Sequence, residues 1–209
     1  MRPALGRDDF FVGPGNAAAV AWIDRWPDWP ANAIAIHGPP GCGKTHLVHV
    51  FAQKADALIL PAQGLSKDAL AEHLASPRPI ALEDCDRAVD ERAILHLFND
   101  AREKKRNILL TGSLPPARWP LALPDLRSRV AAIPAAEIAL PDDQLFEAVI
   151  IKLFADRQLM ITPDVVGFLV RRIDRSFETA RRIVAAADSY SLSGKRPITI
   201  PLLKELLPA

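Results

Sequence analysis

The sequence predicts an α/β fold: five parallel strands form a sheet between helices, and a smaller all-helical unit follows. Three observations support this prediction. A glycine-rich loop, Gly38 to Thr45, lies between a short apolar run and a helical pattern. Apolar runs and helical patterns then alternate up to residue 140, which is typical of parallel sheets. From Pro141 onward the pattern is helical only, so we expect one unit at 1–140 and a second at 141–209.

The segment before the loop predicts one helix. Residues 1–9 show no periodicity, whereas Phe10 to Asn16 combines aromatic and turn residues. Asn16 is suited to cap a helix from Ala17 to Trp26, because its side chain can accept a hydrogen bond from the first turn. The tryptophans of this segment are expected to form a small hydrophobic cluster.

The loop itself matches the phosphate-binding pattern G-x-x-x-x-G-K-[ST]. Its glycines let backbone N–H groups approach a polyphosphate that a Cβ atom would keep away. Lys44 is expected to reach the β- and γ-phosphates, and the Thr45 hydroxyl to hold Mg²⁺. The apolar run Ala33 to Ile36 predicts a strand before the loop, and the helix after it would point its N-terminus at the phosphates. The expected nucleotide-binding residues here are Gly38, Pro39, Pro40, Gly41, Cys42, Gly43, Lys44, Thr45 and His46.

Two further strands and one helix follow. A strand at 57–60 is followed by a short helix that ends at Ala75, for which Ser66 and Asp68 are candidate caps. The run Ile80 to Leu82 then leads directly into Glu83 and Asp84. An apolar strand that ends in adjacent carboxylates beside a phosphate loop is typical of a Walker B element. Such acids order Mg²⁺ and polarise the attacking water, so the candidate metal-binding residues are Thr45, Glu83 and Asp84. The alternative is a strand that simply runs into an acidic turn.

The order of these two acids bears on activity. Many P-loop ATPases place Asp first, whereas Glu83 precedes Asp84 here. A longer side chain at the metal and a shorter one at the water could weaken hydrolysis while leaving nucleotide binding intact. We therefore expect weak or no intrinsic hydrolysis.

The remaining pattern completes the sheet and the helical unit. The last turn and exit of a helix at 90–103 carry four basic residues, Arg102, Lys104, Lys105 and Arg106. We expect them to form a solvated helix end, with a nucleic-acid patch as the alternative. The strand at 107–113 ends in Thr111 and Ser113, either of which could sense the γ-phosphate at the carboxyl edge of the sheet. Asp125 is suited to cap a short helix at 126–130, and 135–140 would be the last strand. The helical segments beyond it are 142–157, 163–173, 177–192 and 200–207.

Composition narrows the class of protein. Of the 209 residues, 49% are hydrophobic and 24% are charged, as in an ordinary soluble globular protein. The formal net charge of +1 gives no global electrostatic reason to expect tight, sequence-independent binding to DNA or to a membrane, and it leaves room for a local basic face. No signal peptide or membrane-spanning run is evident, so we expect a cytoplasmic protein. Cys42 lies beside a helix N-terminus, which could lower its thiol pKa and allow redox control with Cys85.

Four segments resemble the DnaA-related AAA+ ATPase family, and within it the Hda-type regulatory homologues of the replication initiator. Phe10 to Asn16 resembles the box that opens the ATPase domain, and Leu110 to Pro116 resembles the sensor 1 strand and its loop. Leu123 to Arg129 is similar to the arginine-finger segment, and Arg196 to Glu205 to the end of Hda. The resemblance implies an AAA+ base subdomain at 1–140 and a helical lid at 141–209.

The resemblance also implies roles for individual residues. Thr111 would be sensor 1, with Ser113 as the alternative. Arg129 would be an arginine finger that reaches the γ-phosphate bound to a neighbouring subunit; without the resemblance, it would be read as a surface ion pair. Glu178 stands where a sensor 2 arginine is expected, so Arg181 or Arg182 replaces it or that contact is absent. Three residues would lie near the base and ribose: Phe10, Val12 and Asn16.

The function implied is regulation of replication initiation. The protein would bind ADP or ATP with Mg²⁺, dock on DnaA through an AAA+ to AAA+ contact, and use Arg129 to promote hydrolysis of DnaA-bound ATP. The alternative is a non-catalytic, nucleotide-gated adaptor that positions DnaA or another AAA+ partner on DNA. A small P-loop kinase is disfavoured, because the arginines lie in the carboxyl-terminal helices.

The sequence also bears on which partners the protein binds and on which further domains it has. A homodimer is compatible with the sequence. Hda-type proteins bind the DNA polymerase sliding clamp through a short motif, but residues 1–9 contain neither its glutamine nor its paired hydrophobic residues. The chain stops at Ala209 without a further helix-turn-helix module, so we expect no origin-reading domain.

Overall fold

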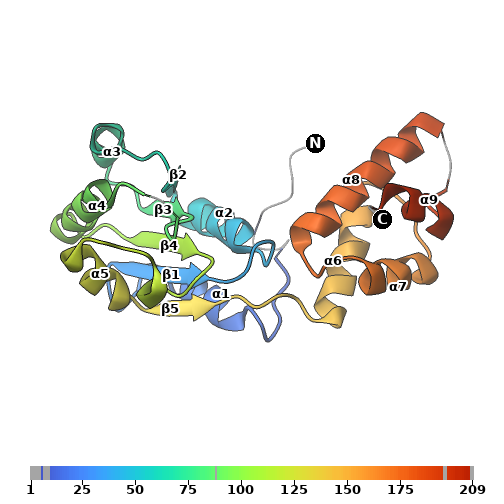
Figure 1. Cartoon of the computed structure of the whole chain (residues 1–209), viewed down its shortest axis with the longest axis horizontal. Helices are drawn as coiled ribbons and strands as arrows, with labels where there is room; N and C mark the ends of the chain where they lie inside the picture. Colours follow the sequence, from blue (N-terminus) through green and yellow to red (C-terminus); the bar gives the residue numbers. More distant parts are fainter. Residues whose placement is uncertain (1–5, 7–9, 88, 195–196, 208–209) are drawn as a thin grey trace. The chain divides into compact units, whose positions relative to one another are not determined.

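A computed structural model of the chain describes residues 6, 10–87, 89–194 and 197–207. It divides into two compact units, one ending at Ala139 and the other beginning at Leu140 (Figure 1). The region where a clamp-binding motif would lie, 1–9, falls outside the described residues except for Gly6. Arg196, at the start of the tail that resembles Hda, also lies outside them.

The first unit contains a sheet of parallel strands. Within the described residues these are β1 (Ala33–His37), β2 (Leu58–Pro61), β3 (Ile80–Glu83), β4 (Ile108–Gly112) and β5 (Ala135–Glu137). Their order is β2-β3-β4-β1-β5, which confirms the predicted five-stranded parallel sheet. Strand β1 pairs with β4 up to His37↔Gly112 and with β5 up to His37↔Glu137. The carboxyl ends of these three strands therefore lie side by side, where the glycine-rich loop begins.

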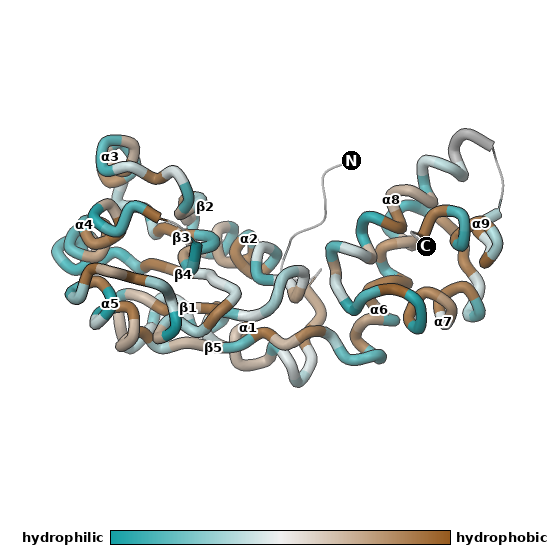
Figure 2. Tube along the Cα trace, in the orientation of Figure 1, coloured by the Kyte–Doolittle hydropathy of each residue, from teal (hydrophilic) through white to brown (hydrophobic). Residues whose placement is uncertain are grey.

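Helices cover both faces of this sheet. They are α1 (Ala17–Arg25), α2 (Lys44–Ala55), α3 (Lys67–Leu74), α4 (Glu91–Glu103), the 3₁₀ turn η2 (Pro116–Arg118) and α5 (Pro124–Ala131). Side chains of β1 alternate between two cores. Ala33 and Ala35 pack with α3, α4 and α5, whereas Ile34 and Ile36 pack with α1 and α2. Figure 2 shows hydrophobic residues along the strands and mixed colours along the helices, as expected of helices with one buried face.

Capping predictions from the sequence were correct for α3 and wrong at two other positions. Ser66 accepts a hydrogen bond from the Ala69 N–H at 3.2 Å. Asn16 stands at the start of α1 but makes no cap; its Oδ1 accepts from the Gly13 N–H at 2.9 Å and its Nδ2 donates to the Phe11 carbonyl at 2.9 Å. It therefore folds the preceding loop instead. Asp125 lies inside α5, because Pro124 fits the first helical position and the helix starts two residues earlier than predicted.

The second unit is built from helices packed around their own core. They are α6 (Asp143–Ala155), α7 (Pro163–Arg172), α8 (Phe177–Gly194) and α9 (Ile200–Leu206). Phe146, Ile150 and Phe154 project from α6 into this core and are fully buried. Asp142 starts α6 by accepting from the Leu145 N–H at 2.8 Å. Among the residues that the structure describes, no helix is long and apolar enough to cross a bilayer.

A buried ion cluster ties the end of α4 to α3. Asp100 contacts Arg106 Nε at 3.1 Å through Oδ2 and Lys104 Nζ at 2.6 Å through Oδ1. Arg106 also donates to the carbonyls of Arg78 at 2.8 Å and Leu74 at 3.1 Å. The predicted solvation of the basic residues after α4 is therefore wrong for Arg106, whose side chain is fully buried. Its partners come from chain segments that the local pattern does not reveal.

We expect Asp100→Ala to lower the free energy of unfolding by about 3–5 kcal/mol, because the Arg106 charge would lose its buried partner. Arg175→Ala is the matched control. That arginine pairs with Asp143 at 2.6 Å, but the two side chains are 50% and 64% exposed, so the loss should be below about 1 kcal/mol. Guanidinium unfolding followed by circular dichroism measures both. Equal losses would show that the Asp100 cluster contributes no more than a surface pair.

Candidate nucleotide-binding site

The glycine-rich loop leaves β1 in a conformation that requires glycine. A Cβ atom at Gly38 would lie 2.1 Å from the Ile138 carbonyl oxygen, so a side chain cannot fit there. Gly43, the last residue before α2, has a φ of 110°, in the region that favours glycine. The N-terminus of α2 therefore opens directly onto the loop, with backbone N–H groups directed towards it. Such a cradle suits phosphate oxygens.

Lys44 lies within this loop. It is the first residue of α2 and only 9% exposed. Its ammonium group donates to the carbonyl oxygens of Gly38 at 2.7 Å and Pro39 at 3.1 Å. The positive charge is thus held over the loop backbone, at the position where a phosphate group would need it.

Thr45 and Glu83 meet across the carboxyl ends of β1 and β3. The Thr45 hydroxyl donates to Glu83 Oε1 at 2.8 Å. Asp84, next along the chain, has a left-handed φ of 56° and approaches Arg87 at 3.7 Å. Hydroxyl and carboxylate oxygens are ligands that Mg²⁺ accepts, together with phosphate oxygens. Within the described ranges, no group of three or more His, Cys, Asp or Glu side chains could hold a metal by itself.

Thr111 supports the acidic turn from the neighbouring strand. It is 1% exposed, its Oγ1 accepts from the Asp84 N–H at 3.3 Å, and its carbonyl accepts from the Cys85 N–H at 2.8 Å. Gly112, which follows, accepts from the Gly38 N–H at 3.2 Å. Strand β4 therefore joins the glycine-rich loop to the acidic turn, and the Thr111 hydroxyl is directed at the backbone of that turn.

Asp86 is a polar residue at this edge whose contacts the sequence did not predict. Its Oδ2 accepts from the N–H groups of Ser113 at 2.7 Å and Leu114 at 3.1 Å. The carboxylate thereby fixes the chain as it leaves β4. The available signal was an acid two positions after Asp84, opposite a strand that ends in small polar residues.

The residues predicted near the base and ribose lie in different environments. Phe10 is 7% exposed and packs edge-on against the His46 ring, with 5.0 Å between the ring centroids. Asn16 is buried and holds the Phe11 to Gly13 turn. Val12 is 50% exposed. The structure thus brings Phe10 to the first turn of α2, while Val12 is the member of this set that offers apolar surface to solvent.

Titratable groups around the loop are shifted by burial. Burial lowers the pKa of His37, an effect that nearby Glu137 opposes and Lys44 reinforces. Burial raises the pKa of the Cys42 thiol, although Lys44 lowers it in part. The pKa of Cys85 is also raised by burial. Burial thus disfavours the redox alternative for Cys42, because loss of solvent raises its pKa more than its surroundings at the helix N-terminus lower it.

Arg129 lies at the other end of the strands. It follows Asp125 by one helical turn in α5, whose carboxyl end leads into the start of β5 (Figure 1). Its Nε and Nη2 donate to the two Asp125 carboxylate oxygens at 3.0 and 3.1 Å, and its Nη1 donates to Asn99 Oδ1 at 2.8 Å. The loop, in contrast, follows the carboxyl end of β1. Arg129 and the loop of the same chain are thus separated by the length of the sheet.

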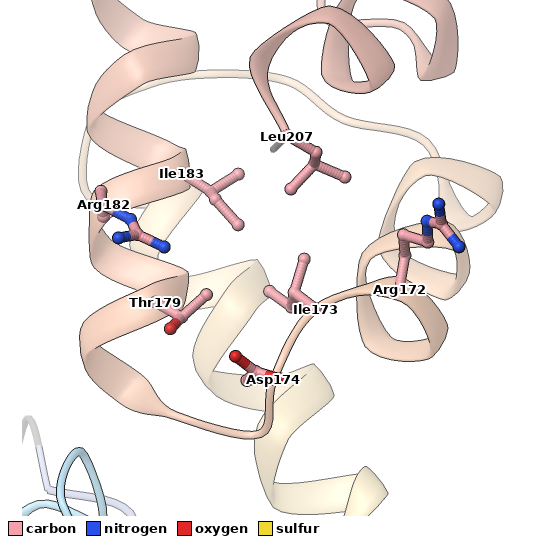
Figure 3. A pocket seen from close by; sticks show the side chains of 7 residues that line it. All are labelled: Arg172, Ile173, Asp174, Thr179, Arg182, Ile183 and Leu207. Carbon is pink, nitrogen blue, oxygen red and sulfur yellow. The ribbon is translucent and has the colours of Figure 1, made fainter. Parts of the chain in front are cut away.

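The two lid arginines proposed for sensor 2 differ in their surroundings. Burial lowers the pKa of Arg181, an effect that Glu178 opposes. Arg182, about 100° further around α8, is exposed. Figure 3 shows it beside a pocket of about 300 Å³ within the second unit. The pocket is lined by Arg172, Ile173, Asp174, Thr179, Arg182, Ile183 and Leu207.

Comparison with known families agrees with this architecture. Residues 143–207 match the family described as "Hda, lid domain", and residues 34–111 match the "ATPase family associated with various cellular activities (AAA)". The chain is 28% identical over 237 residues to the chromosomal replication initiator protein DnaA of Thermomicrobium roseum, covering 99% of this chain and 50% of that protein. It is also 28% identical over 188 residues to an uncharacterized protein of Haemophilus influenzae, covering 82% and 80%. The chain spans about half the length of the DnaA relatives it matches.

Solved structures show the same fold. Domain III of Thermotoga maritima DnaA superposes with a TM-score of 0.86 at 18% identity, covering 99% of this chain and 97% of that one. AMPPCP-bound DnaA of Aquifex aeolicus gives a TM-score of 0.75 at 20% identity, covering 98% and 70%. The predicted AAA+ fold with a helical lid is confirmed.

We expect both cysteines to be unreactive in the native protein, because each thiol is 1% exposed and burial raises its pKa. Ellman's reagent should titrate neither within minutes at mildly alkaline pH, and both after unfolding in guanidinium. Met160→Cys is a positive control, since Met160 is 93% exposed. A native Cys42 that reacted as fast as the thiol introduced at position 160 would contradict the buried geometry of the loop.

Proposed function

Because the chain is a DnaA-related AAA+ protein with an Hda-type lid, we propose that it binds an adenine nucleotide and regulates initiation of DNA replication. Its proposed action is to promote hydrolysis of ATP bound to DnaA. The single observation that carries this action is the position of Arg129, at the opposite end of the strands from its own phosphate loop. An arginine so placed suits a phosphate held by another molecule.

The nucleotide site is proposed at the edge formed by Gly38, Lys44, Thr45 and Glu83. The loop offers backbone N–H groups and one ammonium group for phosphates, and AMPPCP is the ligand of one structural relative. Thr45 and Glu83 would hold Mg²⁺ through their oxygens, with Asp84 beside them. When bound, Mg²⁺ would neutralise charge between the β- and γ-phosphates. Val12 and Phe10 would approach the base.

The proposed chemistry in trans depends on the Arg129 guanidinium. Asp125 and Asn99 engage three of the five N–H donors of this group, and one further N–H on each terminal nitrogen is not part of those bonds. These two donors could meet the γ-phosphate of ATP on DnaA, where negative charge develops during hydrolysis. Arginine fingers of this kind raise hydrolysis rates by about 10³–10⁵.

We expect Lys44→Ala to weaken binding of ATP and ADP about 10- to 100-fold, because a charged hydrogen-bond donor to phosphate is removed. Isothermal calorimetry with and without Mg²⁺ measures the affinities. Lys67→Ala serves as the control, since Lys67 is an exposed lysine at the start of α3. Undiminished binding to the Lys44→Ala protein would rule out the proposed nucleotide site.

We expect Arg129→Ala to reduce stimulated hydrolysis of DnaA-bound ATP by about a thousandfold, to the rate of DnaA alone. The measurement is single-turnover release of phosphate from DnaA-ATP, with and without sliding clamp loaded on DNA. Arg127→Ala, an exposed arginine of the same helix, is the matched control. Equal rates for wild type and Arg129→Ala would contradict the finger role.

A second candidate function is a nucleotide-gated adaptor that positions DnaA or another AAA+ partner without hydrolysis. The observation that favours it is the Thr45–Glu83 hydrogen bond, because with a metal at Thr45 the longer acid would face the metal and the shorter Asp84 would be left for the water. Nucleotide-dependent binding to DnaA in a pull-down, with no increase in phosphate release, would select this function.

A further inference from the structure

The chain between β4 and the helix that carries Arg129 is a packed connector, residues 113–123. Its first end is fixed by Asp86, which accepts from the Ser113 and Leu114 N–H groups. In its middle, the Trp119 indole donates to the Leu114 carbonyl at 2.8 Å and is 5% exposed. A Cβ atom at Gly112 would lie 3.0 Å from this indole, so the connector also packs against the end of β4.

Glu91 fixes the other end of the connector. It is the first residue of α4, and its two carboxylate oxygens accept from consecutive backbone N–H groups. Oε1 accepts from Ala122 at 2.8 Å and Oε2 accepts from Leu123 at 2.6 Å. Leu123 is the N-cap residue immediately before α5. One charged side chain on α4 therefore holds the backbone that enters α5 against α4, with both oxygens used.

Helix α4 contacts α5 again near its other end. Leu126 and Val130 are buried in the core that α5 shares with α4, which fixes the rotation of α5 about its axis. Arg129, next to Val130, then lies beside Asn99 of α4, and the Asn99 side-chain oxygen accepts from its Nη1 at 2.8 Å. The start of α5 and the tip of Arg129 are both set by side chains of one helix.

We propose that Glu91 and Asn99 are positioning residues for Arg129. Glu91 sets the start of α5 and Asn99 orients the guanidinium, so that α4 acts as the scaffold of the finger. The inference rests on the proposed function, because Arg129 must act on a partner's phosphate for its orientation to matter. A displacement of about 1 Å in a catalytic group can reduce a rate about a hundredfold.

The test compares Glu91→Gln and Asn99→Ala in the full chain, using phosphate release from DnaA-ATP at increasing concentrations of the variant. Glutamine keeps one acceptor oxygen, so it loses one of the two bonds to the connector. We expect the maximal stimulated rate to fall about 10- to 100-fold for Glu91→Gln and about threefold to tenfold for Asn99→Ala. The concentration that gives half-maximal stimulation should stay within about twofold of wild type, because docking is untouched.

Controls separate positioning from folding. Glu103→Gln changes an exposed glutamate at the far end of the same helix and should keep the wild-type rate. Hydrogen exchange should accelerate at residues 122–123 in Glu91→Gln but not in Glu103→Gln. Asn99 is exposed, so Asn99→Ala keeps the test valid even if the Glu91 variant folds poorly.

Two results would overturn the inference. One is a wild-type maximal rate for both variants while Arg129→Ala is inactive, which would leave the proposed function standing. The other is a rise in the half-maximal concentration with an unchanged maximal rate, which would assign Glu91 and Asn99 to docking. A wild-type rate for Arg129→Ala would instead refute the proposed function, and this inference with it.

Discussion

The contact between Gly38 and the Ile138 backbone is the constraint on which the nucleotide edge depends. Ile138 follows β5 and donates its N–H to the His37 carbonyl at 2.7 Å, so this backbone reaches across the end of β1. A side chain at position 38 would push the two segments apart. Because Gly38 has none, its N–H also meets the Gly112 carbonyl, and the loop is anchored on both neighbouring strands. Because the loop is held there, the Thr45 hydroxyl that follows it can donate its hydrogen bond to Glu83.

Acidic side chains that bind backbone N–H groups organise the rest of the first unit. Asp86 holds the exit of β4, Asp90 caps α4 through the N–H groups of Arg92 and Ala93, and Glu91 holds the start of α5. A carboxylate that accepts such bonds replaces the water that the loop backbone would otherwise need. The irregular segments between strands are thereby defined by single side chains rather than by regular structure.

Sequence reasoning succeeded where the signal is local. Alternation of apolar runs and helical patterns predicted five parallel strands, and the glycine spacing predicted the loop, because both depend on neighbours in the chain. It failed where a partner is distant in sequence. Arg106 is buried among the carbonyls of Leu74 and Arg78, about thirty residues before it in the chain. The role of Glu91 could not be predicted for the same reason, because the backbone groups that it binds lie about thirty residues further along the chain. Asn16 differs for another reason, because its side chain binds the turn that precedes the helix.

The ion cluster of Asp100, Lys104 and Arg106 limits which replacements the protein can accept during evolution. Loss of Asp100 or of Arg106 alone leaves the other charge in the interior, whereas an apolar replacement of both together removes both buried charges. We therefore expect the residues at positions 100 and 106 to change together in evolution, and single replacements at either position to be selected against. Since the cluster anchors the end of the helix that lies beside Arg129, such paired replacement would alter the resistance of the fold to heat.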